Sequence, residues 1–182
     1  FPFHTWLPDA HTQAPTQGSV ILAAVLLKLG TYGFIRIAIP ILPEAARWWA
    51  PAIGILAVIG IIYGALGCLA QTDMKRLIAF SSVAHMGYVM LGISTLTSFG
   101  INAAIFGMVA HGLITGMLFF IAGSVKDRYH TLEIKRLGGL LLQAPRMGWL
   151  LAFSCMASLG LPGLAGFWGE FPAILSAYQP AD

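Results

Sequence analysis

Gly18-Ser-Val-Ile-Leu-Ala-Ala-Val-Leu-Leu-Lys28-Leu-Gly-Thr-Tyr-Gly-Phe-Ile-Arg-Ile-Ala38 is an almost uninterrupted apolar stretch with a lysine at its centre. A helix over residues 18–38 rises about 1.5 Å per residue and can cross a hydrocarbon core about 30 Å thick. Lys28 would then lie near the bilayer midplane, where a lysine costs roughly 2.5 to 3.5 kcal/mol on insertion scales. Such a residue persists only with a partner, in its neutral form or in a wet cavity, so Lys28 is the first candidate functional residue.

The composition indicates that the rest of the chain is also membrane-embedded. The chain has 182 residues, 58% of them hydrophobic and 9% charged, with a mean hydropathy of +0.80. Soluble domains carry about 25% charged residues. The net charge of +3 is too small to indicate nucleic-acid binding. Cys68 and Cys155 lie in apolar runs and suggest small packing residues rather than a disulfide or a metal pair.

We therefore expect an all-α, polytopic transmembrane helix bundle that forms a single membrane domain. The apolar runs predict about five spans, at approximately residues 18–38, 50–70, 77–97, 101–125 and 147–178. The chain opens without a methionine and ends just after an apolar run, which we interpret as an internal fragment of a longer protein.

The last predicted span is too long for one straight crossing. Gly160-Leu-Pro-Gly-Leu-Ala-Gly166 stands at its middle, and a continuous helix tolerates that sequence poorly. We expect two half-helices joined by an irregular link, which at membrane depth must be buried in protein or line a cavity. In transporters, interrupted helices of this kind point to an ion or substrate path.

The basic residues predict the orientation. If the spans alternate in direction, most basic residues fall on one face, and only Arg36 and Arg47 fall on the other. By the positive-inside rule, loops 71–76 and 126–146 are predicted to be cytoplasmic. The basic residues on that face are Lys75, Arg76, Lys126, Arg128, Lys135, Arg136 and Arg146.

Four ionisable residues lie at similar depth on four different predicted spans: Lys28, His85, His111 and Glu170. A single histidine on an apolar helix is more often a hydrogen-bonded packing residue. Four titratable groups on separate helices instead predict a proton relay, because each can accept and release a proton. The hydroxyl groups available to connect them are those of Ser81, Ser82, Thr115, Ser154 and Ser158.

The same residues permit a metal site as a rival interpretation. His85, His111 and Glu170 could bind a cation, but they lack a local ligand spacing such as His-x-x-x-His. No nucleophile elbow, phosphate-binding glycine loop or haem or iron–sulfur cysteine pattern occurs.

Two groups of residues near the predicted membrane–water interface have simpler interpretations than a relay or a metal site. We expect His4, Asp9 and His11 to be hydrogen-bonding groups of a loop rather than ligands, with a functional role as the alternative. Lys75 and Arg76 begin a span on the positive face, where long basic side chains extend toward water, so we leave Lys75 out of the relay.

Four long motifs resemble the antiporter-like, proton-translocating subunits of respiratory complex I. Together they sample essentially the whole chain: residues 1–36, 72–88 (TDMKRLIAFSSVAHMGY), 108–113 (MVAHGL) and 159–171 (LGLPGLAGFWGEF). The resemblance implies a parent of about fourteen helices containing two inverted repeats. In that parent, this chain would begin just after the seventh helix and run through most of the twelfth.

The resemblance also implies residue roles. Lys28 matches the lysine that links two half-channels, His85 and His111 match polar groups on the central axis, and Glu170 matches the terminal residue near the outward-facing path. An earlier glutamate–lysine pair of the family would precede Phe1. By this resemblance, the fragment alone should not pump.

The resemblance implies a subunit of an NADH:quinone oxidoreductase that moves protons while partner subunits transfer electrons. NADH, FMN, iron–sulfur clusters and quinone are expected on those partners, and no cofactor is expected on this chain. The expected partners are other membrane-arm subunits and the lipid bilayer, in a bacterial plasma membrane. The alternatives are a subunit of a multisubunit sodium/proton antiporter or membrane-bound hydrogenase, and a passive membrane-arm scaffold.

Overall fold

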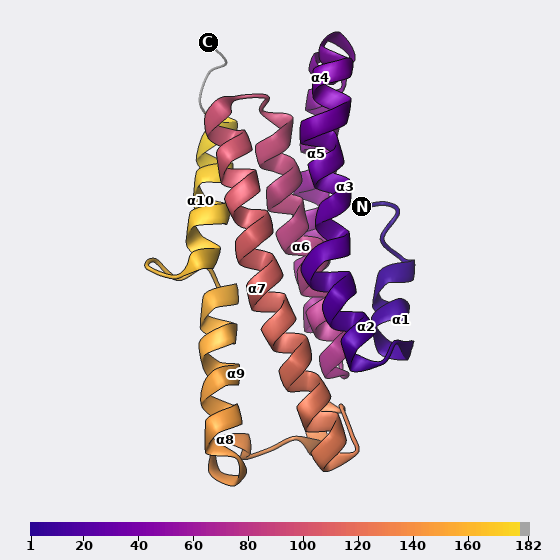
Figure 1. The fold of residues 1–182 in the computed structure, drawn as a ribbon, viewed down its shortest axis with the longest axis vertical. Coiled ribbons are helices and arrows are strands. Elements are labelled where there is room, and N and C mark those ends of the chain that lie inside the picture. Colours follow the sequence, from indigo (N-terminus) through magenta and orange to yellow (C-terminus); the bar gives the residue numbers. More distant parts are fainter. Residues whose placement is uncertain (179–182) are drawn as a thin grey trace.

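The computed structural model describes residues 1–178. Over that range the chain is helical and contains no strand, which confirms the all-α prediction. The long helices run side by side in an elongated bundle (Figure 1). Within the described residues, four helices are long and apolar enough to cross a membrane: Thr16–Ile41, Pro43–Leu69, Met74–Ser94 and Ser98–Tyr129.

The stretch around Lys28 forms one helix with two local distortions. A short helix, α1 (Trp6–Gln13), comes first, and the chain breaks at Ala14 and Pro15, both in extended conformation. The helix then continues through five segments: α2 (Thr16–Ile21), η1 (Leu22–Leu26), α3 (Leu27–Gly33), η2 (Phe34–Ala38) and α4 (Ile39–Ile41). Both η segments are π-helical and lie on either side of Lys28. Single π turns within α-helices occur often at functional sites.

Three long helices follow. They are α5 (Pro43–Leu69), α6 (Met74–Ser94) and α7 (Ser98–Tyr129). The carboxylate of Asp73 caps α6 by accepting from the Arg76 backbone N–H at 3.0 Å, and Thr97 caps α7 in the same way. The cap places the start of α7 at Ser98, directly after a short turn. The connection after α7 contains η3 (Ile134–Arg136) and α8 (Leu140–Gln143).

The predicted interruption of the last apolar run is present. α9 (Pro145–Ser158) ends before the Gly-Leu-Pro-Gly sequence, and α10 (Ala165–Tyr178) begins after it. Gly160 and Gly163 have φ values of +68° and +94°, in the region that favours glycine. The two half-helices follow one another along α7 (Figure 1).

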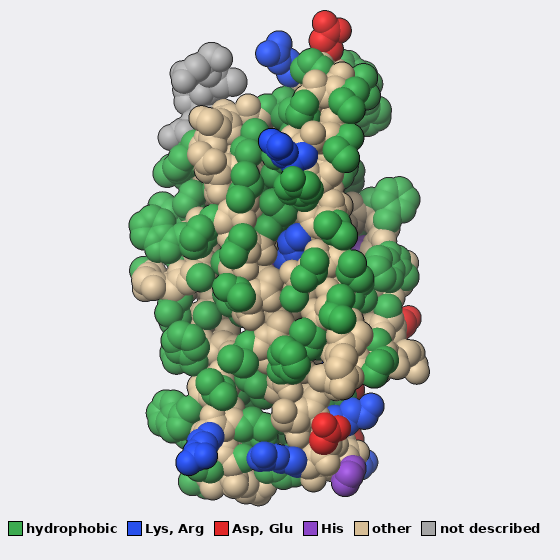
Figure 2. Space-filling model, in the orientation of Figure 1, with side chains coloured by type: hydrophobic (Ala, Val, Ile, Leu, Met, Phe, Trp, Pro, Cys, Tyr) green, Lys and Arg blue, Asp and Glu red, His purple; other side chains and the backbone are tan. Residues whose placement is uncertain are grey.

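α6 lies at the centre of the packing, against α5, α7, α10 and α1. The buried residues of this core are mostly small or apolar, and Phe119 is its largest aromatic side chain. Large hydrophobic side chains cover the middle of the outer surface, while most charged groups lie near the two ends (Figure 2). This pattern is that of a protein whose solvent is lipid.

The two basic loops meet at one end of the bundle. The backbone N–H of Met74 donates to the Leu132 carbonyl at 3.0 Å, and that of Ile134 donates to the Thr72 carbonyl at 2.9 Å. These bonds join the start of α6 to the segment after α7. The basic residues of both loops therefore share one end, as the alternating spans require, and the cytoplasmic assignment of that end stays a prediction.

Candidate functional site

α7 brings His111 to Lys28. The Lys28 Nζ lies 2.7 Å from His111 Nδ1 and also donates to the carbonyl of Ala23 in the π-helical segment η1. His111 is only 7% exposed. An ammonium can only donate, so His111 Nδ1 accepts from Lys28 when the lysine is charged. The two residues form the first pair of the site.

A glycine makes this approach possible. A Cβ added at Gly112 would lie 2.8 Å from the Ala24 carbonyl oxygen, closer than real side chains come. Because Gly112 has no side chain, α7 contacts the backbone of η1 directly. The same close contact holds the neighbouring His111 within hydrogen-bonding distance of Lys28.

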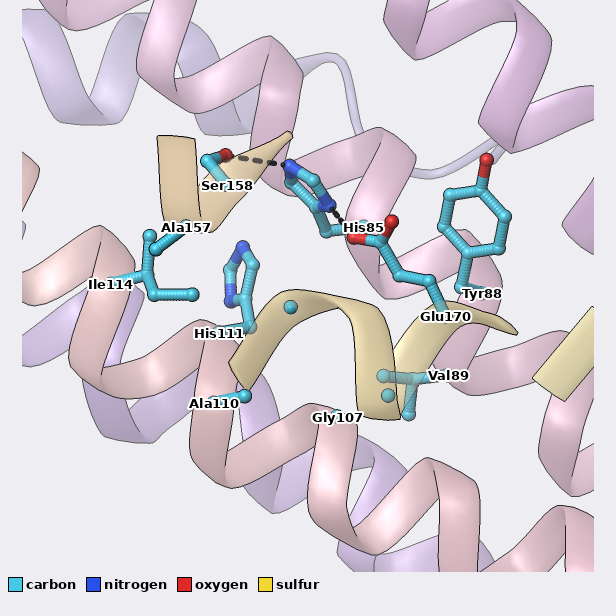
Figure 3. Close-up of a pocket in the computed structure, with 12 residues that line it drawn as sticks. His85, Tyr88, Val89, Gly107, Ala110, His111, Ile114, Ala157, Ser158 and Glu170 are labelled. Atoms are coloured by element: carbon cyan, nitrogen blue, oxygen red, sulfur yellow. Dashed lines mark hydrogen bonds and ion pairs between the residues drawn. The ribbon is translucent and has the colours of Figure 1, made fainter. Parts of the chain in front are cut away.

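His85, on α6, forms the second pair with Glu170 (Figure 3). His85 Nδ1 lies 2.6 Å from Glu170 Oε1 on α10, and His85 Nε2 lies 3.0 Å from Ser158 Oγ on α9. The His85 and Glu170 side chains are 19% and 22% exposed. One imidazole is thus held from both sides by the two half-helices of the interrupted helix.

A small cavity separates the two pairs. The rings of His85 and His111 have centroids 5.5 Å apart and are tilted by 50°. The cavity between them has a volume of about 20 Å³, and Ser158 and Glu170 also line it (Figure 3). A cavity of about 10–15 Å³ is already large enough to hold one water molecule. Lys28, His111, His85 and Glu170 therefore form two direct contacts joined across a gap that one water can bridge.

The candidate hydroxyl groups differ in what they contact. Ser81 and Ser82 both bond to the carbonyl of Ile78, and Ser154 bonds to the carbonyl of Leu150 in its own helix. Among the predicted hydroxyls that have a hydrogen bond in residues 1–178, Ser158 is the one that reaches a relay residue.

Lys75 does not extend toward water, so that interpretation of the sequence is wrong. Its side chain is 1% exposed, and its Nζ donates to the Ala14 carbonyl at 2.9 Å. The break between α1 and α2 covers it. The adjacent Arg76 does reach the surface, at 47% exposure, and pairs with Asp9 at 2.5 Å. Sequence alone gives no signal that separates these two neighbouring basic residues.

His11 is also deeper than the sequence indicates. It lies within α1, has an exposed fraction of 0%, and stacks on Phe119 with ring centroids 4.5 Å apart. Neither ring nitrogen has a hydrogen-bond partner within residues 1–178. Burial, together with the nearby charges of Lys75 and Lys28, lowers the pKa of His11 to about 4, so the ring is neutral at pH 7.

The other members of that predicted group have separate surroundings. His4 packs against Phe1 and Tyr63, while Asp9 pairs with Arg76. Over residues 1–178 no group of three or more His, Cys, Asp or Glu side chains is arranged to hold a metal ion.

Residues 1–181 match the family described as NADH:quinone oxidoreductase/Mrp antiporter, TM. The chain belongs to this family. The match confirms the resemblance drawn from the four motifs and establishes the chain as an integral membrane segment.

The curated relatives of this chain are consistent with the family match. The chain is 51% identical over 178 residues to NADH-quinone oxidoreductase subunit M from Rickettsia bellii, covering 98% of this chain and 36% of the relative. It is 51% identical over 179 residues to subunit M from Rhodobacter capsulatus, covering 98% of this chain and 35% of the relative. The chain thus spans little more than a third of the length of these relatives.

Solved structures share the fold. A chain of respiratory complex I from Thermus thermophilus with bound NADH matches with a TM-score of 0.92 and 38% identity, covering 98% of this chain and 38% of that one. A chain of the membrane-bound sulfane sulfur reductase, an archaeal respiratory complex, matches with a TM-score of 0.88 and 27% identity, covering 98% of this chain and 37% of that one. The Mrp complex from Dietzia sp. matches with a TM-score of 0.91 at 24% identity, covering 97% of this chain and 33% of that one, a likeness of fold alone.

Proposed function

We propose that this chain is part of a proton-translocating membrane subunit of an NADH–quinone oxidoreductase, and that Lys28, His111, His85 and Glu170 carry the proton. The observation that supports the relay is the end-to-end order of the two pairs, Lys28–His111 and His85–Glu170, across a cavity the size of one water. A passive scaffold has no use for four titratable groups in this order, because each is costly within lipid.

The first step is a transfer from lysine to histidine. The proton moves from Lys28 Nζ to His111 Nδ1 along the 2.7 Å contact, which leaves a neutral amine and an imidazolium. His111 can then release the proton on Nε2, which has no partner within residues 1–178. The ring thus takes a proton on one side and gives one up on the other.

The second step ends on the carboxylate. A proton that crosses the cavity is taken up at His85 Nε2, which makes the ring an imidazolium, and His85 then passes its Nδ1 proton to Glu170 Oε1 at 2.6 Å. The N–H bond of the imidazolium breaks, an O–H bond forms on Glu170, and the charged pair becomes a neutral pair. A change in the partner of one charged group alters the proton affinity of the next, which moves the proton onward.

The electron chemistry belongs to other subunits in this proposal. NADH oxidation and quinone reduction, with FMN and iron–sulfur clusters, would take place on partners of the membrane arm and beyond it. The 51% identity to subunit M over nearly the whole chain favours an NADH–quinone oxidoreductase. The structures of the Mrp complex and the sulfane sulfur reductase have 24% and 27% identity. We assign the basic end to the cytoplasmic side of a bacterial plasma membrane.

The test uses the full-length subunit in its assembled complex. Lys28→Ala and Glu170→Ala are expected to reduce proton pumping strongly, with assembly and electron-input activity of the other subunits retained. Lys126→Ala is the matched control, because Lys126 is exposed on the last turn of α7. Normal proton-to-electron ratios in both relay variants would contradict the proposed relay. Normal ratios in a variant with all four relay residues replaced by apolar ones would support the passive scaffold.

A further inference from the structure

We propose that Ser158 is a positioning residue that holds His85 in register with Glu170 in both protonation states of the imidazole. The proposal rests on the proposed function of the relay and assigns a role to the interruption between α9 and α10. Ser158 is the last residue of α9, and Glu170 lies in α10 beyond the link.

The geometry supports a two-sided hold on the ring. Ser158 Oγ lies 3.0 Å from Nε2, and Glu170 Oε1 lies 2.6 Å from Nδ1 (Figure 3). The two contacts use both nitrogens, so they fix the tilt of the ring as well as its position. A rotation of His85 about its side-chain bonds would break both hydrogen bonds at once.

A hydroxyl suits both states of the ring. When His85 is neutral with its proton on Nδ1, the Ser158 O–H donates to Nε2. When His85 is an imidazolium, or neutral with its proton on Nε2, the Nε2–H donates to Ser158 Oγ, and the hydroxyl hydrogen turns away. Transfer of the Nδ1 proton to Glu170 therefore leaves the ring in place. A donor-only or acceptor-only group would match one state and oppose the other.

The link between the half-helices brings Ser158 and Glu170 to the same histidine. Gly160 has φ +68°, and a Cβ built on it would lie 2.9 Å from Glu170 Oε2. The backbone of the link therefore lies directly against the free oxygen of the carboxylate. A movement of this link would displace Ser158 and Glu170 together relative to His85, which sits on the separate helix α6.

The chain provides a matched control on the same helix. Ser154 lies one turn before Ser158, is buried, and its hydroxyl donates to the Leu150 carbonyl at 2.8 Å. Replacing either serine by alanine deletes one oxygen from α9. Ser158→Ala removes a hydrogen bond to the relay, whereas Ser154→Ala removes one within the helix backbone.

The titratable groups that face His85 are few within the described residues. Glu170 faces it from α10, His111 from α7, and Tyr88 lies on the cavity wall from α6 itself (Figure 3). A change in the pH dependence of pumping after substitution of Ser158 would report on this set. A loss of packing alone would lower the amount of assembled complex and leave the pH profile in place.

The experiment compares Ser158→Ala, Ser158→Thr and Ser154→Ala in the full-length, assembled complex. Ser158→Ala is expected to slow proton pumping by about fivefold to tenfold, since it leaves the partly buried Nε2 of His85 without its partner, and to move the pH of half-maximal pumping. Ser158→Thr keeps the hydroxyl and is expected to stay within about twofold of the parent. Ser154→Ala is expected to leave rate and pH profile unchanged.

Two outcomes overturn the inference. One is normal pumping by Ser158→Ala at every pH, and the other is an equal loss in Ser154→Ala. Glu170→Gln, measured in parallel, separates this failure from that of the relay. If Glu170→Gln stops pumping while Ser158→Ala does not affect it, the role of Ser158 alone is lost. If both pump normally, the proposed function is lost as well.

Discussion

Two helix interruptions contact α6 in chemically different ways. At the first, between α1 and α2, Lys75 donates to the backbone carbonyl of Ala14. At the second, between α9 and α10, His85 contacts the Ser158 hydroxyl and the Glu170 carboxylate. Both residues of α6 are titratable, and each reaches the point where a neighbouring helix breaks.

The difference lies in what each partner can do. A backbone carbonyl only accepts, so the Lys75 contact is a fixed anchor. It provides a hydrogen-bond donor for the Ala14 carbonyl at the break between α1 and α2. A carboxylate and a hydroxyl can gain, lose or reorient a proton, so the His85 contacts can exchange. An interruption next to a buried ionisable residue is therefore not sufficient to identify a proton path, and the chemistry of the partner decides.

The largest effect should come from removing the exchangeable partner. Glu170→Gln preserves the shape of the side chain but removes the proton acceptor, and we expect pumping to fall by at least about tenfold. Proton uptake by the reconstituted complex measures the effect. Glu44→Gln, at an exposed acid in the first turn of α5, is the control and should have no effect. If pumping by Glu170→Gln stays within about twofold of the parent, the second interruption has only a structural role, like the first.

A substitution at a helix contact tests the first pair without touching either interruption. Gly112→Ala places a methyl group 2.8 Å from the Ala24 carbonyl, which forces α7 away from η1 and Lys28 away from His111. We expect a destabilisation of about 1–3 kcal/mol and slower pumping per assembled complex. Gly116→Ala, one turn later, meets Ala24 at an ordinary 3.6 Å and should be tolerated. Equal behaviour of the two variants would show that the close approach is unimportant.

The anchor at the first interruption should affect stability rather than transport. Lys75→Met retains most of the side-chain volume but leaves the Ala14 carbonyl without its donor, at a cost of about 1–3 kcal/mol. The thermal unfolding midpoint of the purified complex should fall, while the proton-to-electron ratio stays normal. Lys126→Met changes an exposed lysine and serves as the control. A normal midpoint combined with a lowered ratio in Lys75→Met would move Lys75 from the anchor to the relay.

The smallest effect concerns His11, beside the first interruption. Its pKa of about 4 lies below the usual value of about 6.5, so the unfolded chain binds a proton first as the pH falls. The contribution of His11 to stability is therefore present above about pH 6.5 and decreases toward pH 4. The unfolding midpoint of His11→Gln should depend less on pH between 7.5 and 5 than that of the parent. His130→Asn, at an exposed position, should leave the pH dependence unchanged.

Much of the fold could be predicted from the sequence because lipid imposes simple rules. Long apolar runs must be helices, and a continuous helix tolerates the glycines and proline from Gly160 to Gly163 poorly. The cost of ionisable groups in lipid singles out the four candidate relay residues, and their role stays a prediction. Their pairing could not be predicted, since it depends on close approaches such as that of Gly112 to Ala24. The burial of Lys75 and His11 also could not be predicted from the sequence, because a proline-containing break near the start of a helix has the sequence pattern of an exposed loop.

The most direct test of the central claim asks whether both pairs serve one route. Lys28→Met, Glu170→Gln and the double variant would be made in the full-length subunit, and the proton-to-electron ratio of each reconstituted complex would be measured. A single relay predicts that each substitution lowers the ratio and that the double variant is no worse than the more severe single one. Losses that add together in the double variant, or a normal ratio in either single variant, would contradict a shared path from Lys28 to Glu170.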